Sequence, residues 1–165
     1  MTTPLEIIDS AVKIGLGALV SGIATYLVTR TNHRHELRKA DREERRTLIR
    51  NISRVLEDAM TLVNQGTYAF QQDEGVDDAG SGLLVGAINK LGEAKSLAVL
   101  LGNHELSKAI TELRAGIVEL AHYVGPGSKG RDPATVNRMI GKMNMPWPTI
   151  HAELESSYAK VGSDA

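Results

Sequence analysis

The least polar stretch of the chain lies near its N-terminus and predicts a membrane-spanning helix. Residues 11–28 read AVKIGLGALVSGIATYLV, with Lys13 as the only charge. This length is at the short end of the roughly 17–25 apolar residues that a spanning helix needs. Lys13 is close enough to the start for its ammonium group to reach the headgroups, and Tyr26 and Arg30 lie where an interfacial ring and a charged stop are expected. We predict a transmembrane anchor over residues 11–29; the alternative is a buried core helix of a soluble protein.

Basic residues lie on one side of this segment, which predicts its orientation. Residues 1–10 contain Glu6 and Asp9 but no Lys or Arg, whereas residues 30–46 are rich in arginine. Because Lys and Arg stay on the cytoplasmic side, we expect a single-pass protein with its N-terminus outside and its C-terminal part in the cytoplasm. The acidic N-terminal flank and the lack of an A-x-A site argue against a cleaved signal peptide.

Small residues in the predicted anchor recur at a spacing of four, which favours close packing against another helix. Gly17 and Ser21 form one such pair, and Ala18 and Gly22 form another. Small side chains on one ridge let a second helix approach closely, so we predict a homo-oligomer or packing on another helical membrane protein. The residues predicted to pack there are Gly15, Gly17, Ala18, Ser21, Gly22 and Thr25. The alternative is that glycine is simply common in membrane helices.

Arginine then recurs at every fourth position from Arg30 to Arg54. Interleaved acids such as Glu36 and Glu43 offset the repulsion between like charges at i, i+4, so residues 30–47 are predicted to form a long, charged, solvated helix. Its first turns are expected to contact membrane lipids of anionic type; the alternative is an ordinary stop-transfer cluster. The predicted headgroup contacts are Arg30, Arg34, Arg38 and Lys39. The interleaved acids and the net charge of -1 argue against nucleic-acid binding.

From residue 48 onward, apolar residues follow the helical spacing i, i+4, i+7, i+8. An acidic, glycine-rich stretch over residues 71–82 predicts a loop. Gly102-Asn103 predicts the end of one helix and the start of the next, and Asp132-Pro133 predicts another start. The short connection between the middle helices indicates an antiparallel hairpin.

The predicted fold class is therefore all-α: one N-terminal transmembrane helix, a long charged helix and a small antiparallel helical bundle. The bundle covers residues 48–161, between the charged segment and a short tail over residues 162–165. Residues 1–10 form a flank before the anchor.

No pattern in the sequence predicts catalysis, a metal site or a cofactor. Cysteine is absent, which excludes thiol catalysis and zinc-thiolate sites. His33 and His35 are two residues apart, so they diverge on a helix, and H-E-x-x-H does not occur. The GPGSKG stretch over residues 125–130 lacks the full phosphate-loop pattern. We therefore predict no enzymatic activity, no cofactor and no small-molecule substrate.

The segment around Trp147 is the best candidate for a partner-binding surface. It places the only tryptophan between two prolines and close to methionines. Trp is favoured as an interface anchor and Met as an adaptable contact, so Met143, Met145 and Trp147 are predicted to bind a partner. The alternative is that Trp147 fills one end of the bundle core.

These features favour a non-enzymatic, membrane-anchored helical interaction or scaffold protein, oligomeric and with its soluble domain on the cytoplasmic face. The alternative is a pore-forming or membrane-perturbing component, such as a bacterial or phage lysis or defence effector, that acts through the small-residue-rich apolar helix. An enzyme with a tethered helical domain is disfavoured because no acid–base or metal set is visible.

Overall fold

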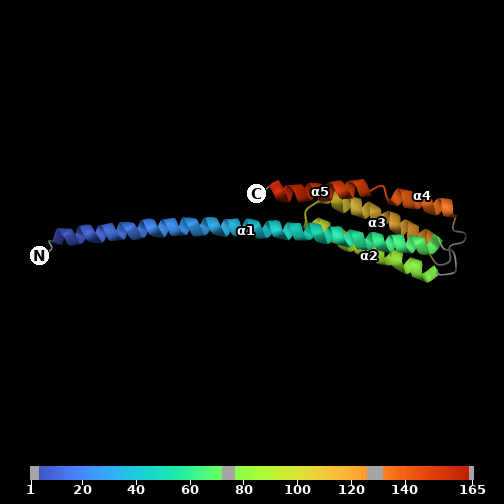
Figure 1. Cartoon of the computed structure of the whole chain (residues 1–165), viewed down its shortest axis with the longest axis horizontal. Helices are drawn as coiled ribbons and strands as arrows, with labels where there is room; N and C mark the ends of the chain where they lie inside the picture. The colour runs from blue at the N-terminus through green and yellow to red at the C-terminus, as the bar shows by residue number, and fades with distance from the viewer. Residues whose placement is uncertain (1–3, 72–76, 126–131, 164–165) are drawn as a thin grey trace. The chain divides into compact units, whose positions relative to one another are not determined.

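The computed structural model describes the backbone of residues 4–71, 77–125 and 132–163, and within them the side chains of residues 21, 22, 25–70, 80–125 and 132–162. Every secondary-structure element in the described part is an α-helix (Figure 1). The helices are α1 (Pro4–Gln71), α2 (Asp77–Leu100), α3 (His104–Val124), α4 (Pro133–Met143) and α5 (Trp147–Ser163). The chain divides into two units, Met1–Glu43 and Glu44–Ala165.

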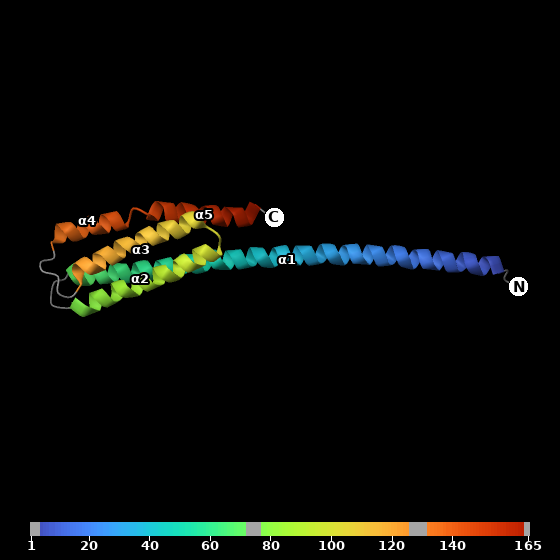
Figure 2. The same ribbon diagram turned by 180° about the vertical axis from the view of Figure 1, so that it is seen from behind.

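The second unit is an antiparallel helical bundle, as predicted from residue 48 onward. The C-terminal part of α1 runs beside α2, and α4 and α5 follow one another to form the fourth side (Figures 1 and 2). Helix α3 packs against α2, α4 and α5. The predicted all-α bundle is therefore confirmed, and its last side consists of two short helices, as the break at residues 145–148 predicts.

A continuous apolar core holds the bundle together. Helix α3 supplies its centre with five side chains of 0% exposure at helical spacing. These are Leu106, Ile110, Leu113, Ile117 and Leu120. Helix α1 contributes Ile52, Leu56 and Val63, and helix α2 contributes Leu84 and Leu91. Burial of this apolar surface is the main stabilising contribution to the bundle.

Two predicted helix starts are confirmed by their caps. Asn103 precedes α3, and its side-chain oxygen accepts a hydrogen bond from the amide of Leu106 at 2.9 Å. Gly102 has a φ of +75°, which glycine adopts easily, and the amide of Asn103 donates to the carbonyl of Ala98. Asp132 caps α4, which has Pro133 at its first position.

The predicted loop over residues 71–82 was wrong for Gln71, where α1 ends, and for residues 77–82, because α2 already begins at Asp77. Acidic residues are favourable in the first turn of a helix, and glycine here serves helix packing. A Cβ built on Gly80 would lie 2.9 Å from Cζ of Phe70, and one on Gly66 would lie 3.1 Å from the carbonyl oxygen of Gly80. These glycines let α1 and α2 approach closely, which is a function that a turn signal in the sequence conceals.

A helical glycine that contacts a neighbouring helix and one with open space beside it should respond in opposite ways to substitution by alanine. Gly80→Ala should lower the free energy of unfolding by about 1–3 kcal/mol, because the Phe70 ring has to move. Gly92→Ala should raise it by about 0.5–1 kcal/mol, since a Cβ there meets nothing within 4 Å and alanine favours the helix. Urea unfolding followed by the fluorescence of Trp147 measures both changes. Equal effects of the two substitutions would contradict this assignment.

The cap of α4 predicts a specific pH dependence. A hydrogen bond from the Thr135 hydroxyl, then backbone amides including that of Ala134, lower the pKa of Asp132 below its ordinary value of 3.8. A carboxyl group with a lowered folded pKa stabilises the fold above its unfolded pKa, and loses that contribution as pH falls through the folded value. At neutral pH the parent should therefore be more stable than Asp132→Asn, and the difference should vanish on acidification below pH 3.8. Urea titrations of both proteins at several pH values test this, and a difference that does not change with pH would refute it.

The predicted membrane anchor lies largely outside the described side chains, which omit residues 11–20, 23 and 24. No helix in the described part of the chain combines the length and apolar character that crossing a membrane requires.

Candidate functional site

The described end of the predicted anchor exposes apolar side chains directly before a basic segment. Tyr26 is 63% exposed, Leu27 53% and Val28 59%. Thr29 and then Arg30 follow this run, and both are exposed as well. Apolar side chains next to arginines form the kind of surface that lipid or another protein covers. Water solvates the arginines favourably, but it does not solvate the apolar side chains favourably.

All four predicted headgroup contacts are exposed on α1. Arg30, Arg34, Arg38 and Lys39 lie in the first unit, among other exposed residues. The next arginine, Arg42, is half-buried and its Nε donates to the carbonyl oxygen of Arg38 at 3.3 Å. The first four cations are thus positioned to contact an anionic surface, and their contact with lipid stays a prediction.

The residues predicted to pack in the membrane fall into two groups. Gly15, Gly17 and Ala18 lie outside the residues whose side chains are described. Ser21, Gly22 and Thr25 are exposed, and a Cβ on Gly22 would meet nothing within 4 Å. The second group therefore leaves room for a neighbouring helix.

The three residues of the predicted partner surface have different environments. Met143 is 2% exposed and belongs to the core, where its Cα and Cβ would each lie 3.3 Å from a Cβ on Gly116 of α3. Met145 is 75% exposed, and Trp147 is partly buried against the core. Met143 therefore has a packing position, while partner binding by Met145 and Trp147 stays a prediction.

Trp147 also carries an unusual buried donor. Its Nε1 is buried and has no hydrogen-bond partner among the described residues, and its ring lies 5.4 Å from that of His151 at a tilt of 36°. A buried donor without an acceptor is unfavourable by about 1–3 kcal/mol. The indole packs at the junction of α4 and α5, and partner binding by Trp147 and the filling of the bundle end both stay open.

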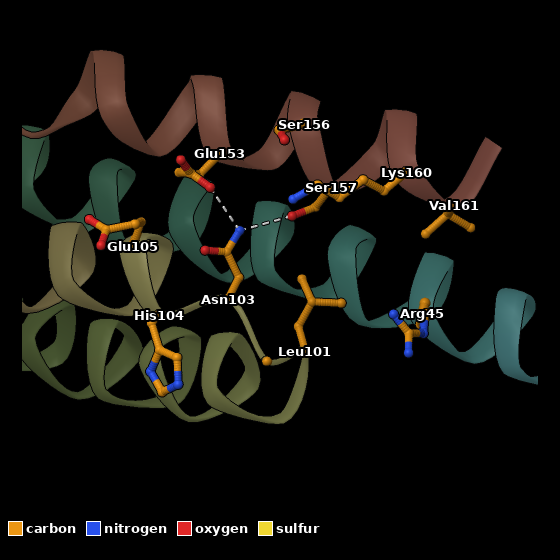
Figure 3. A pocket seen from close by; sticks show the side chains of 11 residues that line it. Arg45, Leu101, Asn103, His104, Glu105, Glu153, Ser156, Ser157, Lys160 and Val161 are labelled. Carbon is orange, nitrogen blue, oxygen red and sulfur yellow. Dashed lines mark hydrogen bonds between the residues drawn. The ribbon is translucent and has the colours of Figure 1, made fainter. Parts of the chain in front are cut away.

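A polar cavity of about 540 Å³ lies at the end of the bundle where α2 turns into α3 (Figure 3). Arg45 of α1, the residues of the turn and the C-terminal half of α5 line it. It contains both signs of charge, from Arg45 and Lys160 on one hand and Glu105 and Glu153 on the other. This balance favours no particular class of ligand.

One side of the cavity is a hydrogen-bonded tie between the α2–α3 turn and α5. The side-chain nitrogen of Asn103 donates to Oε2 of Glu153 and to Oγ of the buried Ser157, each at 3.0 Å (Figure 3). The same side chain caps α3 through its oxygen. Asn103 thus fixes the position of α5, which is a structural task. The sequence predicted the cap, but partners 50 and 54 residues away gave no local signal.

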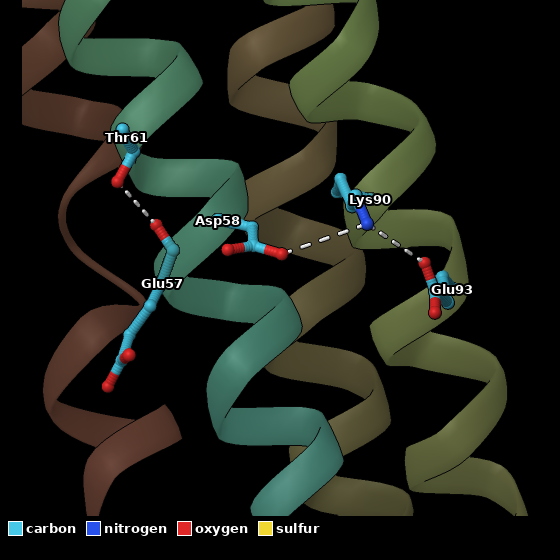
Figure 4. Close-up of polar contacts among 5 residues, drawn as sticks. All are labelled: Glu57, Asp58, Thr61, Lys90 and Glu93. Atoms are coloured by element: carbon cyan, nitrogen blue, oxygen red, sulfur yellow. Dashed lines mark hydrogen bonds and ion pairs between the residues drawn. The ribbon is translucent and has the colours of Figure 1, made fainter.

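The ion pairs on the outer surface of α1 and α2 are weak. Nζ of Lys90 lies 3.8 Å from Oδ2 of Asp58 and 3.6 Å from Oε2 of Glu93 (Figure 4). These groups are substantially exposed, so such pairs contribute about 0–1 kcal/mol. The Lys90–Asp58 pair joins α2 to α1, and neither pair forms a reactive site.

Among the described residues, no three His, Cys, Asp or Glu side chains are grouped so that they could hold a metal ion. Comparison of the chain with protein-family models, characterised proteins and solved structures found no match.

Proposed function

We propose that this chain is a membrane-anchored helical interaction protein, with residues 11–29 as its anchor and the bundle as the domain that it presents in the cytoplasm. The observation that carries the proposal is the exposed apolar run from Tyr26 to Val28, followed after Thr29 by exposed Arg30. Lipid tails would cover the apolar side chains and headgroups would bind the basic ones. Arg34, Arg38 and Lys39 would extend the same contact.

The residues that form the bundle core support separate roles for the anchor and for the bundle. Its buried residues all come from residue 49 onward, with Ile49 and Ile52 the first of them in the described part of the chain. The second unit therefore has a continuous apolar core among its own described residues.

The proposed role of the bundle is to bind another protein. Exposed Met145 beside the partly buried Trp147 is the surface that we assign to a partner.

Deletion of residues 1–29 tests the anchor. The truncated chain should move from the membrane fraction to the soluble fraction and keep the helical circular dichroism and cooperative unfolding of the bundle. A matched control, deletion of residues 162–165 only, should stay in the membrane fraction. A truncated chain that unfolds would place the apolar helix in the core, and one that stays in the membrane fraction would remove the anchor from residues 11–29.

A further inference from the structure

Residues 133–152 contain no acidic side chain. They cover α4, the turn after it and the start of α5, on the fourth side of the bundle (Figure 1). The basic side chains of this stretch are Arg138, Lys142 and His151. Helices α2, α3 and α5 each contain both signs of charge, and so does the C-terminal part of α1. The stretch is therefore a region of the bundle that contributes positive charge only.

Two cations and an apolar side chain lie on one side of this stretch. Arg138 and Lys142 are exposed at the helical spacing i, i+4. Met145 comes three residues later, and its amide donates to the carbonyl oxygen of Lys142 at 3.1 Å, so the chain continues to wind past the end of α4. Met145 is 75% exposed. We call Arg138, Lys142 and Met145 the α4 face.

The cations of the α4 face have no acid beside them on their own helix. No Asp or Glu occurs within four residues of either one, and neither forms an ion pair among the described residues. By contrast, Lys108 on α3 lies between Glu105 and Glu112 at helical spacing. The charge of the α4 face is therefore not balanced locally.

The two acids that bound the stretch accept structural hydrogen bonds. Oδ2 of Asp132 accepts from the amide and the hydroxyl of Thr135, at 3.0 and 2.7 Å. Arg138 attracts this carboxylate without forming an ion pair with it. Oε2 of Glu153 accepts from the side-chain nitrogen of Asn103 (Figure 3). Both carboxylates therefore hold helices in place.

We propose that the α4 face binds an acidic segment of another protein, in which carboxylates lie next to an apolar side chain. The inference rests on the proposed function, which assigns partner binding to Met145 and Trp147, and it names the chemistry of that partner. Carboxylates of the segment would pair with Arg138 and Lys142. Its apolar side chain would cover the thioether of Met145, which adapts to partners of different shape.

The spacing of the α4 face favours a protein segment over a lipid surface. At 1.5 Å per residue, Arg138 and Lys142 are about 6 Å apart along the helix. Carboxylates on successive turns of a partner helix have the same spacing, whereas lipid headgroups have no fixed spacing. The indole N–H of Trp147, which would favour a membrane interface, is buried.

The α4 face is small, so the expected complex is weak and salt-dependent. Three side chains cover far less than the about 800 Å² per partner of a stable interface. Opposite charges at the rim of an interface mainly increase the association rate, and salt screens them. Sodium chloride should therefore weaken the binding of an acidic partner.

Fluorescence anisotropy of a labelled acidic peptide tests this chemistry on the full-length chain in an uncharged detergent. The probe is EELAAEELAA with blocked termini, which places glutamates one helical turn apart beside leucine. The parent chain should bind it about tenfold more tightly than it binds QQLAAQQLAA, which keeps the leucines and lacks the charges. Equal binding of the two peptides, or binding of neither, would overturn the proposal.

Variants of Lys142 locate the binding on the α4 face. Lys142→Glu should weaken binding of the acidic probe about tenfold, and Lys142→Gln, which adds no repulsion, about threefold. Lys95→Glu reverses an exposed lysine of α2; it is the matched control and should change binding by less than about twofold. Thermal unfolding followed by circular dichroism checks that each variant is folded. Equal weakening by Lys142→Glu and Lys95→Glu would overturn the proposal.

Met145→Gln separates this inference from the proposed function. If binding falls with the Lys142 variants only, the acidic partner stands and Met145 is removed from the proposed partner surface. If binding falls with Met145→Gln only, the acidic partner is overturned and the proposed surface stands. Two other results would also overturn it: labelled phosphatidylglycerol that depends on Lys142 while the peptide does not bind, and a dimer of the parent that Lys142→Glu dissociates.

Discussion

Leu113→Ala should lower the free energy of unfolding of the bundle by about 2–5 kcal/mol, the largest effect that we expect from a single core substitution. Leu113 is 0% exposed on α3, the helix that packs against α2, α4 and α5. Truncation of this side chain leaves a cavity in a close-packed core, and the three surrounding helices can move only part of the way to fill it. Urea unfolding followed by Trp147 fluorescence measures the change, because the only tryptophan is packed against this core.

Leu100→Ala is the matched control for Leu113→Ala. Leu100 is 72% exposed at the end of α2, so the same change of side chain should alter stability by about 0.5 kcal/mol or less. Equal losses from the two substitutions would mean that α3 does not form the centre of the core.

Leu19→Arg should remove the chain from the membrane fraction. The substitution places a guanidinium near the middle of the predicted anchor, where an arginine disfavours insertion by about 2.5–3.5 kcal/mol, or roughly 100-fold. Extraction of membranes with alkaline carbonate measures the effect, since it removes proteins that do not span the bilayer.

The control for Leu19→Arg is Leu37→Arg, which lies beyond the anchor at an exposed leucine of the basic segment. It should leave the chain in the carbonate-resistant pellet, because it adds a positive charge on the predicted cytoplasmic side. Loss of both variants from the pellet would show that charge anywhere in α1, and not insertion of residues 11–29, decides the fractionation.

Helical periodicity and capping residues were sufficient to predict most of the bundle. Ile52, Leu84 and Leu113 are buried where the spacing of apolar residues placed them. Asn103 and Asp132 cap helices as predicted, because an N-cap acts on amides two or three residues away and is therefore visible locally.

The remaining features depend on contacts between distant parts of the chain. Gly80 was interpreted as a loop residue, and only the position of Phe70 shows that it permits the close approach of two helices. Met143 and Met145 are alike in sequence, but the approach of Gly116 buries the first and leaves the second exposed. Sequence spacing contains no information on such pairs, since each depends on which helix faces which.

Part of the candidate site could also be predicted from the sequence. Exposure of Arg30, Arg34, Arg38 and Lys39 follows from a charged helix with no apolar stripe, and the sequence was enough to expect it.

Labelling of single cysteines in intact cells tests the membrane topology most directly. The natural chain has no cysteine, so Thr2→Cys and Ser163→Cys each supply one thiol for a maleimide that cannot cross membranes. We predict labelling of the Thr2→Cys protein in intact cells, and of the Ser163→Cys protein only after the membrane is permeabilised. Labelling of neither in intact cells, with the chain released by carbonate, would contradict the membrane anchor.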